Sequence, residues 1–336
     1  MKFTLTDFSI FNLWQPCEGC QRCAQEKLAL EAKVRELTLQ IAQLKANAAP
    51  TLGPAPAYPS EVAVEVAPLP ELVGWAHLKA SVKGTGKAEL QDAHEVLAVG
   101  QSIVLIVCDG AGSKTRSKAG ADFAVKQLKA TIGEFLTTGA PLGPDEWQSH
   151  TKRWLGEVAH GLAQMAEGEK QPLQEYGCTC IIVFANDDYV ACTHVGDGRA
   201  GYLDEASIWR NLMVPYKGAE ANSTVFLSML TEENADSYVR HHTEPCRSRS
   251  IVALSDGPES VCWHVSTLNQ TGDGLIDPNV PSGVFFGKIA NQLASAAVQK
   301  VPQDKLDEAW AKFLTDGNPQ LASEIDDKTL LVALRG

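Results

Sequence analysis

Residues 178–203 read CTCIIVFANDDYVACTHVGDGRAGYL, and this stretch decides the fold class of the chain. Two apolar runs flank Asn186, Asp187 and Asp188, which are residue types that favour a hairpin turn. A third short strand is expected after Gly198. Strands that follow one another this closely are typical of antiparallel sheets, because parallel strands need long crossover connections.

The same pattern continues on both sides of this stretch. Apolar runs bounded by turn residues predict further strands, and longer stretches between them predict helices. Strands outnumber strand–helix–strand units, which indicates an α+β fold of antiparallel sheets with helices outside. The expected strands include 103–108, 250–254 and 328–334, and the expected helices are 119–132, 147–168, 290–298 and 306–314.

The composition is that of an ordinary globular protein. Hydrophobic residues make up 44% and charged residues 21% of the 336 residues, which excludes a wholly disordered or membrane-embedded chain. The longest strongly apolar run, 103–108, is far shorter than a membrane-spanning helix, and the N-terminus lacks the features of a signal peptide. The net charge of −12 disfavours binding to nucleic acid or anionic lipid. We therefore expect a cytoplasmic protein with no nucleic-acid or membrane partner.

Four segments are expected along the chain. A Cys-containing segment (1–24) precedes an amphipathic helix (25–45), a Pro/Ala-rich linker (46–71) and a catalytic-sized domain (72–336). In the helix, alternating spacings of four and three separate Leu30, Val34, Leu37, Ile41 and Leu44, as in a coiled coil. This helix either pairs with a second copy of the chain or a partner protein, or it docks on its own domain.

The nine cysteines fall into two groups. Cys17, Cys20 and Cys23 offer three thiolate ligands, so a zinc site completed by a ligand from a second chain is one interpretation. Interchain disulfides, lipidation and simple burial are the alternatives. The other six cysteines are scattered singly through the apolar half of the chain, which favours reduced core thiols over a disulfide framework.

Aspartates mark the ends of several predicted strands. Asp92, Asp109, Asp197, Asp256 and Asp326 each lie next to an apolar run. A single aspartate at such a place is usually a solvated turn residue. Several that converge at the edge of one β-core repel one another unless divalent cations neutralise them. All-oxygen ligand sets suit Mg²⁺ or Mn²⁺, so the pattern predicts a site for such ions.

Six motifs follow one another through the domain. They are GKAELQDAHEV (86–96), IVLIVCDGAGS (103–113), GCTC (177–180), THVGDGRAGYL (193–203), IVALSDGPES (251–260) and DDKTLLVAL (326–334). This ordered set resembles the metal-dependent serine/threonine protein phosphatases of the PPM class, the protein phosphatase 2C family, in its bacterial form. The resemblance implies a four-layer αββα sandwich of two antiparallel sheets flanked by helices.

The resemblance also implies roles for the residues in these motifs. Asp109 resembles the aspartate that bridges two metal ions, and the Gly110 carbonyl resembles a further ligand. Asp256 and Asp326 match the carboxylates that complete the binuclear centre. Asp92 matches the aspartate that orders metal-bound water.

Three more positions complete the comparison with the family pattern. Asp197 matches a residue that, together with Asp256, holds a third and weaker ion. Lys87 stands where the family has an arginine that binds the substrate phosphate, which keeps the charge but loses the bidentate guanidinium. Ala111 stands where animal members have a histidine and bacterial-type members have none.

The implied activity is hydrolysis of phosphoserine and phosphothreonine in a phosphorylated protein substrate. Asp92, Asp109 and Lys87 would be the catalytic residues, and a water that bridges two Mg²⁺ or Mn²⁺ ions would be the nucleophile. One alternative, which Lys87 supports, is a catalytically weak or inactive pseudophosphatase that acts as a regulatory or scaffold module through its N-terminal coiled coil. Another is hydrolysis of a small phosphorylated metabolite. The basic segment 204–249 either recognises a phosphorylated partner or is a solvated face.

Overall fold

Two five-stranded antiparallel sheets face each other in the computed structural model, which describes residues 72, 74–140, 142–216, 224–268 and 274–336. The antiparallel pairing predicted from residues 178–203 is confirmed. The first sheet has the order β1 (Trp75–Val82), β14 (Lys328–Arg335), β9 (Ser250–Leu254), β6 (Arg199–Leu203) and β7 (Trp209–Asn211). The second has the order β2 (Ala93–Val99), β3 (Ser102–Cys108), β4 (Cys180–Ala185), β5 (Val190–Val195) and β8 (Arg240–Glu244).

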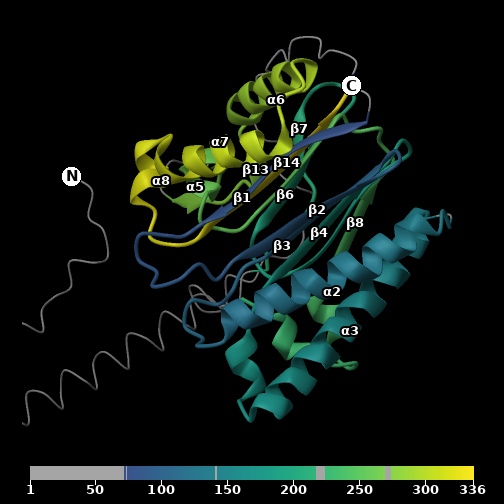
Figure 1. The fold of residues 1–336 in the computed structure, drawn as a ribbon, viewed down its shortest axis with the longest axis vertical. Coiled ribbons are helices and arrows are strands. Elements are labelled where there is room, and N and C mark those ends of the chain that lie inside the picture. The colour runs from purple at the N-terminus through teal and green to yellow at the C-terminus, as the bar shows by residue number, and fades with distance from the viewer. Residues whose placement is uncertain (1–71, 73, 141, 217–223, 269–273) are drawn as a thin grey trace, which may run out of the picture. The chain divides into compact units, whose positions relative to one another are not determined.

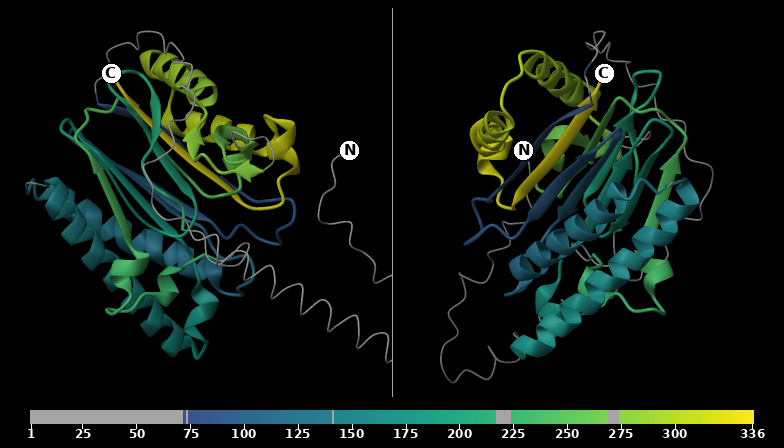
Figure 2. Two further views of the ribbon diagram at one scale, coloured as in Figure 1. Left: turned by 180° about the vertical axis from the view of Figure 1, so that it is seen from behind. Right: turned by 45° about the vertical axis from the view of Figure 1, so that its right-hand side comes forward.

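Helices cover the outer face of each sheet, which confirms the expected four-layer sandwich (Figures 1 and 2). Helices α2 (Ser117–Thr137) and α3 (Pro144–Glu169) cover the second sheet, whereas α6 (Gly283–Val298), α7 (Gln303–Asp316) and α8 (Pro319–Ser323) cover the first. Helix α6 begins at Gly283 rather than at the predicted position 290. The Ser282 side chain caps it by accepting a hydrogen bond from Phe285 N at 3.3 Å.

Short elements connect the layers. Between β7 and β8 lie η4 (Leu227–Met229) and α4 (Ala235–Tyr238), and η3 (Leu173–Tyr176) precedes β4. Between β9 and α6 lie α5 (Glu259–Cys262), the strand pair β10 (Trp263–His264) and β13 (Val280–Pro281), and the strand pair β11 (Thr267–Leu268) and β12 (Leu275–Ile276).

The unbroken apolar run in β3 follows from its burial on both faces. Ile103, Leu105 and Val107 pack between the two sheets, whereas Val104 and Ile106 face helices α2 and α3. Successive side chains in a strand point to opposite faces, so a strand buried on both sides has no polar position. Odd-numbered residues of β3 therefore point toward the space between the sheets, and this direction continues to residue 109.

The predicted reduced cysteines are confirmed for the described part of the chain. Cys108, Cys178, Cys180, Cys192 and Cys262 are free and buried, and Cys246 is free and half-buried. Burial raises the pKa of the Cys178 thiol, which keeps it protonated. These cysteines therefore act as small apolar core residues.

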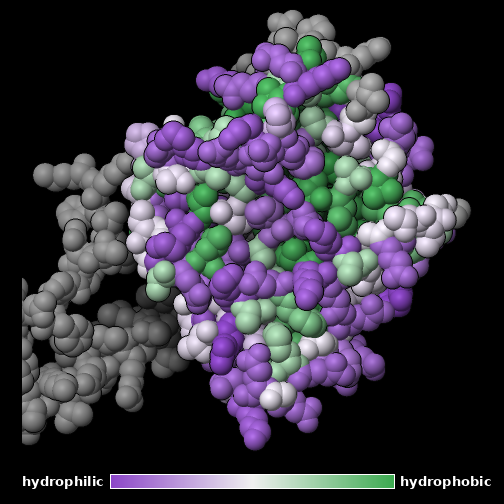
Figure 3. Space-filling view, in the orientation of Figure 1, coloured by the Kyte–Doolittle hydropathy of each residue, from purple (hydrophilic) through white to green (hydrophobic). Residues whose placement is uncertain are grey.

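The predicted Cys-containing segment 1–24, the amphipathic helix 25–45 and the linker 46–71 lie outside the described residues. No helix in the described ranges combines the length and the apolar character that a bilayer crossing requires. Hydrophilic side chains predominate on the face shown in Figure 3, with smaller apolar areas among them.

Candidate active site

The predicted aspartates gather at one end of the space between the two sheets. Strands β3, β5 and β9 end there, and β2, β4, β6 and β14 begin there, because neighbouring strands are antiparallel. Each aspartate lies just outside one of these strand ends. The order along the chain is Asp92 before β2, Asp109 after β3, Asp197 before β6, Asp256 after β9 and Asp326 before β14.

Asp109 is fixed by the backbone that leads into β4. Thr179 N donates a hydrogen bond to the Asp109 carbonyl at 2.8 Å, and Asp109 N donates to Thr179 Oγ1 at 3.1 Å. Ala111 N donates to the Gly177 carbonyl at 3.0 Å. These bonds extend the β3–β4 ladder beyond both strands and give the 109–111 turn a defined position. The GCTC motif therefore acts as the support of this turn.

Asp92 is buried and connects the two sheets. Its Oδ2 accepts hydrogen bonds from Ser255 Oγ at 2.9 Å and from Thr329 Oγ1 at 2.7 Å, both in the opposite sheet or at its edge. Its Oδ1 is also buried and has no hydrogen-bond partner among the described residues. A buried carboxylate oxygen without a donor is costly unless a cation or a water satisfies it.

Lys87 projects into the aspartate cluster from the loop between β1 and β2. Its Nζ lies 2.7 Å from Asp326 Oδ1 and 3.3 Å from Gln91 Oε1. A Cβ built on Gly112 would lie 2.6 Å from this Nζ, so the ammonium group lies against the turn that follows Asp109. Lys87 is therefore part of the site and not a solvated surface lysine.

Asp327 holds both ends of the loop that carries Lys87. Its Oδ1 accepts a hydrogen bond from Gly84 N at 2.9 Å, and its Oδ2 accepts one from Gln91 N at 2.6 Å. Gly86 N also donates to the Ile325 carbonyl at 3.0 Å. A Cβ on Gly84 would lie 2.3 Å from the Asp326 carbonyl, so only glycine permits this approach.

Asp256 and Asp197 complete the cluster on the side of the first sheet. Asp256 Oδ1 is buried and lacks a hydrogen-bond partner in the described ranges, as does Asp92 Oδ1. Asp197 lies in the β5–β6 turn, where Gly196 has a φ of +113°, a conformation that L side chains rarely adopt. A Cβ on Gly196 would also lie 2.5 Å from Thr179 Cγ2. Glycine at position 196 thus permits the tight turn that places Asp197 two residues after the end of β5.

Burial and mutual repulsion raise the pKa values of the central carboxyls. Burial raises the pKa of Asp109 well above its ordinary value, and the charges of Asp92 and Asp256 raise it further. Burial, followed by the charges of Asp197 and Asp326, raises the pKa of Asp256 to about 7. Burial also raises the pKa of Asp92 to about 6, although the Thr329 hydroxyl opposes this shift. Each of these carboxyls lies close to other negative charges, so its ionisation is unfavourable unless a cation is bound nearby.

The residues present fit divalent cations in their chemistry. Asp92 and Asp256 each present a buried, unsatisfied carboxylate oxygen, and oxygen ligands suit Mg²⁺ and Mn²⁺. No group of three or more His, Cys, Asp or Glu side chains in the described ranges is already arranged to hold a metal ion. One of the five aspartates, Asp326, is instead paired with the Lys87 ammonium.

Two histidines close to the motifs in sequence have other partners. His94 Nδ1 lies 2.7 Å from Ser81 Oγ, and His194 Nε2 lies 3.0 Å from the Val214 carbonyl. Burial lowers the pKa of each to about 4. Both are therefore neutral near pH 7 and serve the fold.

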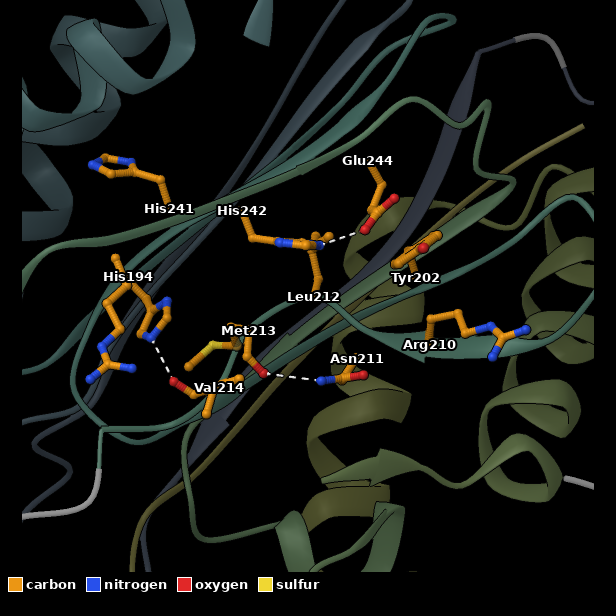
Figure 4. A pocket seen from close by; sticks show the side chains of 11 residues that line it. His194, Tyr202, Arg210, Asn211, Leu212, Met213, Val214, His241, His242 and Glu244 are labelled. Atoms are coloured by element: carbon orange, nitrogen blue, oxygen red, sulfur yellow. Dashed lines mark hydrogen bonds and ion pairs between the residues drawn. The ribbon is translucent and has the colours of Figure 1, made fainter. Parts of the chain in front are cut away.

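The basic segment 204–249 contributes to a separate cavity of about 430 Å³ between β5, β8 and the residues after β7 (Figure 4). Two of its lining side chains have polar partners within the chain: Arg210 Nε lies 2.9 Å from Asp204 Oδ2, and His242 Nε2 lies 2.7 Å from Glu244 Oε1. Its lining includes none of the clustered aspartates, and residues 217–223 lie outside the described part of the chain.

Sequence reasoning did not identify the supporting residues of the site. Ser255 and Thr329 hold Asp92, and Asp327 holds the Lys87 loop at Gly84 and Gln91, through hydrogen bonds that join distant parts of the chain. The signal available was weak: each of these residues lies beside a predicted ligand or shares its motif. Their partners could not be deduced without the pairing of the two sheets.

Solved structures with a similar chain path include several phosphatases. The catalytic domain of the serine/threonine protein phosphatase PstP, in complex with two manganese ions, aligns with 77% of this chain and 97% of its own at 14% identity and a TM-score of 0.48. PppA of Pseudomonas aeruginosa aligns with 80% of this chain and 100% of its own at 13% identity and a TM-score of 0.48. RsbX in complex with magnesium aligns with 78% and 96% at 15% identity and a TM-score of 0.44.

No curated protein sequence matches the chain. The sequence profile of one family, described as protein phosphatase 2C, matches residues 85–311. This match covers more than half of the chain and contains Lys87 and the first four of the five clustered aspartates, while Asp326 follows it. The ordered motifs, the paired antiparallel sheets and the aspartate cluster at their shared end agree with this match, and the chain belongs to the protein phosphatase 2C family.

Proposed function

We propose that the protein is a Mg²⁺- or Mn²⁺-dependent phosphatase that hydrolyses phosphoserine and phosphothreonine in proteins. The observation that carries this proposal is the aspartate cluster, in which Asp92 and Asp256 each present a buried, unsatisfied carboxylate oxygen. An apolar core gains nothing from such groups, since an unpaired buried carboxylate costs free energy. Their retention at one end of the sandwich is best explained by a bound cation.

Each residue of the cluster has a distinct proposed role. Asp109, Asp256 and Asp326, together with the Gly110 carbonyl, would hold two divalent cations, and Asp197 with Asp256 would hold a third. When bound, these cations supply a nucleophilic water at neutral pH and neutralise charge on the phosphoryl group.

The remaining residues would position the reactants. Asp92 is held by Ser255 and Thr329, so its free Oδ1 has a fixed direction in which it can accept a hydrogen bond from the attacking water. Lys87 carries the positive charge that would bind a phosphoryl oxygen, and Asp327 fixes the loop on which it lies. Gly177 and Thr179 hold the turn that contains Asp109.

The test is hydrolysis of p-nitrophenyl phosphate and of a phosphothreonine peptide by the full chain, with Mn²⁺, with Mg²⁺ and with EDTA. We expect turnover with the metal ions, none with EDTA, and none in Asp109→Ala. Asp122→Ala, on the exposed surface of α2, is the matched control. Turnover that is equal with and without EDTA would contradict the proposal.

A catalytically inactive scaffold is the second candidate, and one observation favours it. Lys87 is paired with Asp326, one of the expected metal ligands, so the site is partly neutralised without a divalent cation. This candidate predicts Mn²⁺ binding with no release of phosphate from either substrate.

A further inference from the structure

The Lys87 ammonium group occupies the place of a counter-ion in the acidic site. Its Nζ lies 2.7 Å from Asp326 Oδ1, and the side chain of Lys87 is 15% exposed. Burial lowers the pKa of Lys87, but the hydrogen bond to Asp326 and the charges of Asp326, Asp327 and Asp109 outweigh this, so that its pKa is raised. The negative charge of the cluster is therefore partly balanced by a cation that belongs to the chain itself.

The backbone holds Lys87 in this place. Asp327 accepts hydrogen bonds from both ends of the loop, at Gly84 N and Gln91 N. Lys83 Nζ donates to the Lys87 carbonyl at 2.6 Å. Because the loop is anchored on both sides of Lys87, the ammonium has a high effective concentration at Asp326 and competes with any free cation that needs the same oxygen.

We propose that Lys87 is a tethered cation that competes with a divalent metal ion for Asp326 and thereby sets the metal affinity of the site. This inference rests on the proposed metal-dependent function. Asp326 Oδ1 also accepts a hydrogen bond from Asp327 N at 2.8 Å, so a metal ion that takes this oxygen would have to displace the ammonium. The displaced ammonium remains on its anchored loop, beside the metal site, where a phosphoryl group would bind.

The Lys87 side chain would thus have two successive partners, Asp326 before metal binding and the substrate phosphate after it. At low metal concentration Lys87 pairs with Asp326, and the site is closed to a substrate anion by its own negative charge. At higher metal concentration the cluster is neutralised and Lys87 is free to meet the phosphate. A guanidinium, which binds carboxylates with two parallel hydrogen bonds, would compete differently from the lysine found here.

The test is a double-mutant cycle on Mn²⁺ affinity, in which the spin-resonance signal of free Mn²⁺ is measured without substrate. The four proteins are the wild type, Lys87→Gln, Asp326→Asn and the double variant. We expect Lys87→Gln to bind Mn²⁺ about tenfold more tightly than the wild type. In the Asp326→Asn background the same change should alter the affinity by less than about twofold, because the contested oxygen is gone.

Lys118→Gln is the matched control. Lys118 Nζ lies 2.9 Å from Asp122 Oδ2 on the exposed surface of α2. Lys118→Gln therefore removes the same charge and the same type of ion pair at a position outside the site. Its Mn²⁺ affinity should equal that of the wild type. Circular dichroism of every variant verifies that it is folded, and Lys87→Arg retains the charge if Lys87→Gln proves unstable.

Three results would overturn the inference, and the first two separate it from the proposed function. If the wild type and Lys87→Gln bind Mn²⁺ equally, Lys87 does not compete, although the metal site and the phosphatase proposal stand. If none of the four proteins binds Mn²⁺, both the competition and the metal-dependent function are wrong. An equal gain in affinity for Lys118→Gln would also overturn it, since general charge would then explain the effect.

Discussion

Asp256 is a proposed metal ligand whose ionisation is opposed by its surroundings in the fold. Its pKa is raised from 3.8 to about 7, first by burial and then by the charges of Asp197 and Asp326. Between these two pH values the folded protein binds a proton that the unfolded chain releases. The carboxyl therefore contributes stability that is fully present below about pH 4 and is lost as the pH rises through about 7.

Asp256→Asn should consequently stabilise the metal-free protein at high pH. At pH 8 the variant lacks the buried charge, and we expect its Tm in EDTA to exceed that of the wild type by on the order of 5 °C. At pH 5, where the wild-type carboxyl is protonated, the difference should be much smaller. Thermal unfolding at both pH values measures this, with Asp122→Asn as an exposed control. A Tm difference that does not change with pH would contradict the raised pKa.

Lys87→Arg tests the phosphate-binding role of the same position. An arginine offers a planar fork that matches two phosphoryl oxygens, whereas lysine offers a single charged point. We expect the KM for a phosphothreonine peptide to fall several-fold, with a smaller change in kcat. Steady-state kinetics at saturating Mn²⁺ measure both constants, and an unchanged KM would place the phosphate elsewhere.

The loop between β1 and β2 is the element that connects the fold to the chemistry. Asp327 lies at the start of β14, is 2% exposed, and binds the loop at Gly84 and Gln91. The residue before β14, a strand of the first sheet, thereby positions a loop that leads into β2 of the second sheet. A change in this contact should affect stability and substrate binding together.

Asp327→Ala should destabilise the protein and raise the KM. It leaves two buried backbone N–H groups without acceptors, which costs about 2–4 kcal/mol of the free energy of unfolding. The freed loop holds Lys87 less firmly, so we expect a higher KM and a smaller effect on kcat. Asp327→Asn keeps one acceptor oxygen and should recover part of both losses. Denaturant unfolding and steady-state kinetics are the measurements, and a wild-type KM in Asp327→Ala would show that the loop does not depend on this contact.

At the scale of the whole molecule, the core and the candidate site both lie within residues 72–336. The described residues form three clusters of buried apolar side chains, one between the sheets and one under each helical layer. We therefore expect residues 72–336 to fold as a unit.

Removal of residues 1–71 should leave the Tm and the Mn²⁺-dependent turnover within error of the full chain. If the helix expected at 25–45 pairs two copies, the same truncation converts a dimer into a monomer. Light scattering and the phosphatase assay on both proteins measure these outcomes. Loss of turnover in a folded truncated protein would contradict the assignment of the chemistry to residues 72–336.

The sequence predicted the elements better than the contacts between them. The two apolar runs in residues 178–203 and the run at 103–108 predicted strands that the structure contains, because local patterns report local burial. The order of the motifs indicated the αββα sandwich. The pairing of Lys87 with Asp326 and the anchoring of the loop by Asp327 join positions more than two hundred residues apart. Such contacts depend on which strands pair, and strand pairing cannot be predicted from a local sequence pattern.

The start of helix α6 illustrates the same limit. The apolar periodicity from position 290 predicted its second half, whereas its first turns depend on the cap at Ser282. The first turn includes Val284, an apolar residue that is exposed to solvent. An apolar residue on the exposed face does not fit the amphipathic pattern that indicates a helix. Helix boundaries that depend on a cap and on tertiary packing are missed when periodicity is the only guide.

The proposed activity requires that the aspartate cluster bind divalent cations in order to hydrolyse a phosphate ester. It is tested by phosphate release from a phosphothreonine peptide while Mn²⁺ is titrated into metal-free protein, with Asp109→Asn beside the wild type. Release by the wild type is expected to be absent in EDTA, to rise with Mn²⁺ to saturation, and to be lost in the variant at every Mn²⁺ concentration. Release that is independent of Mn²⁺, or that is equal in Asp109→Asn, would contradict it.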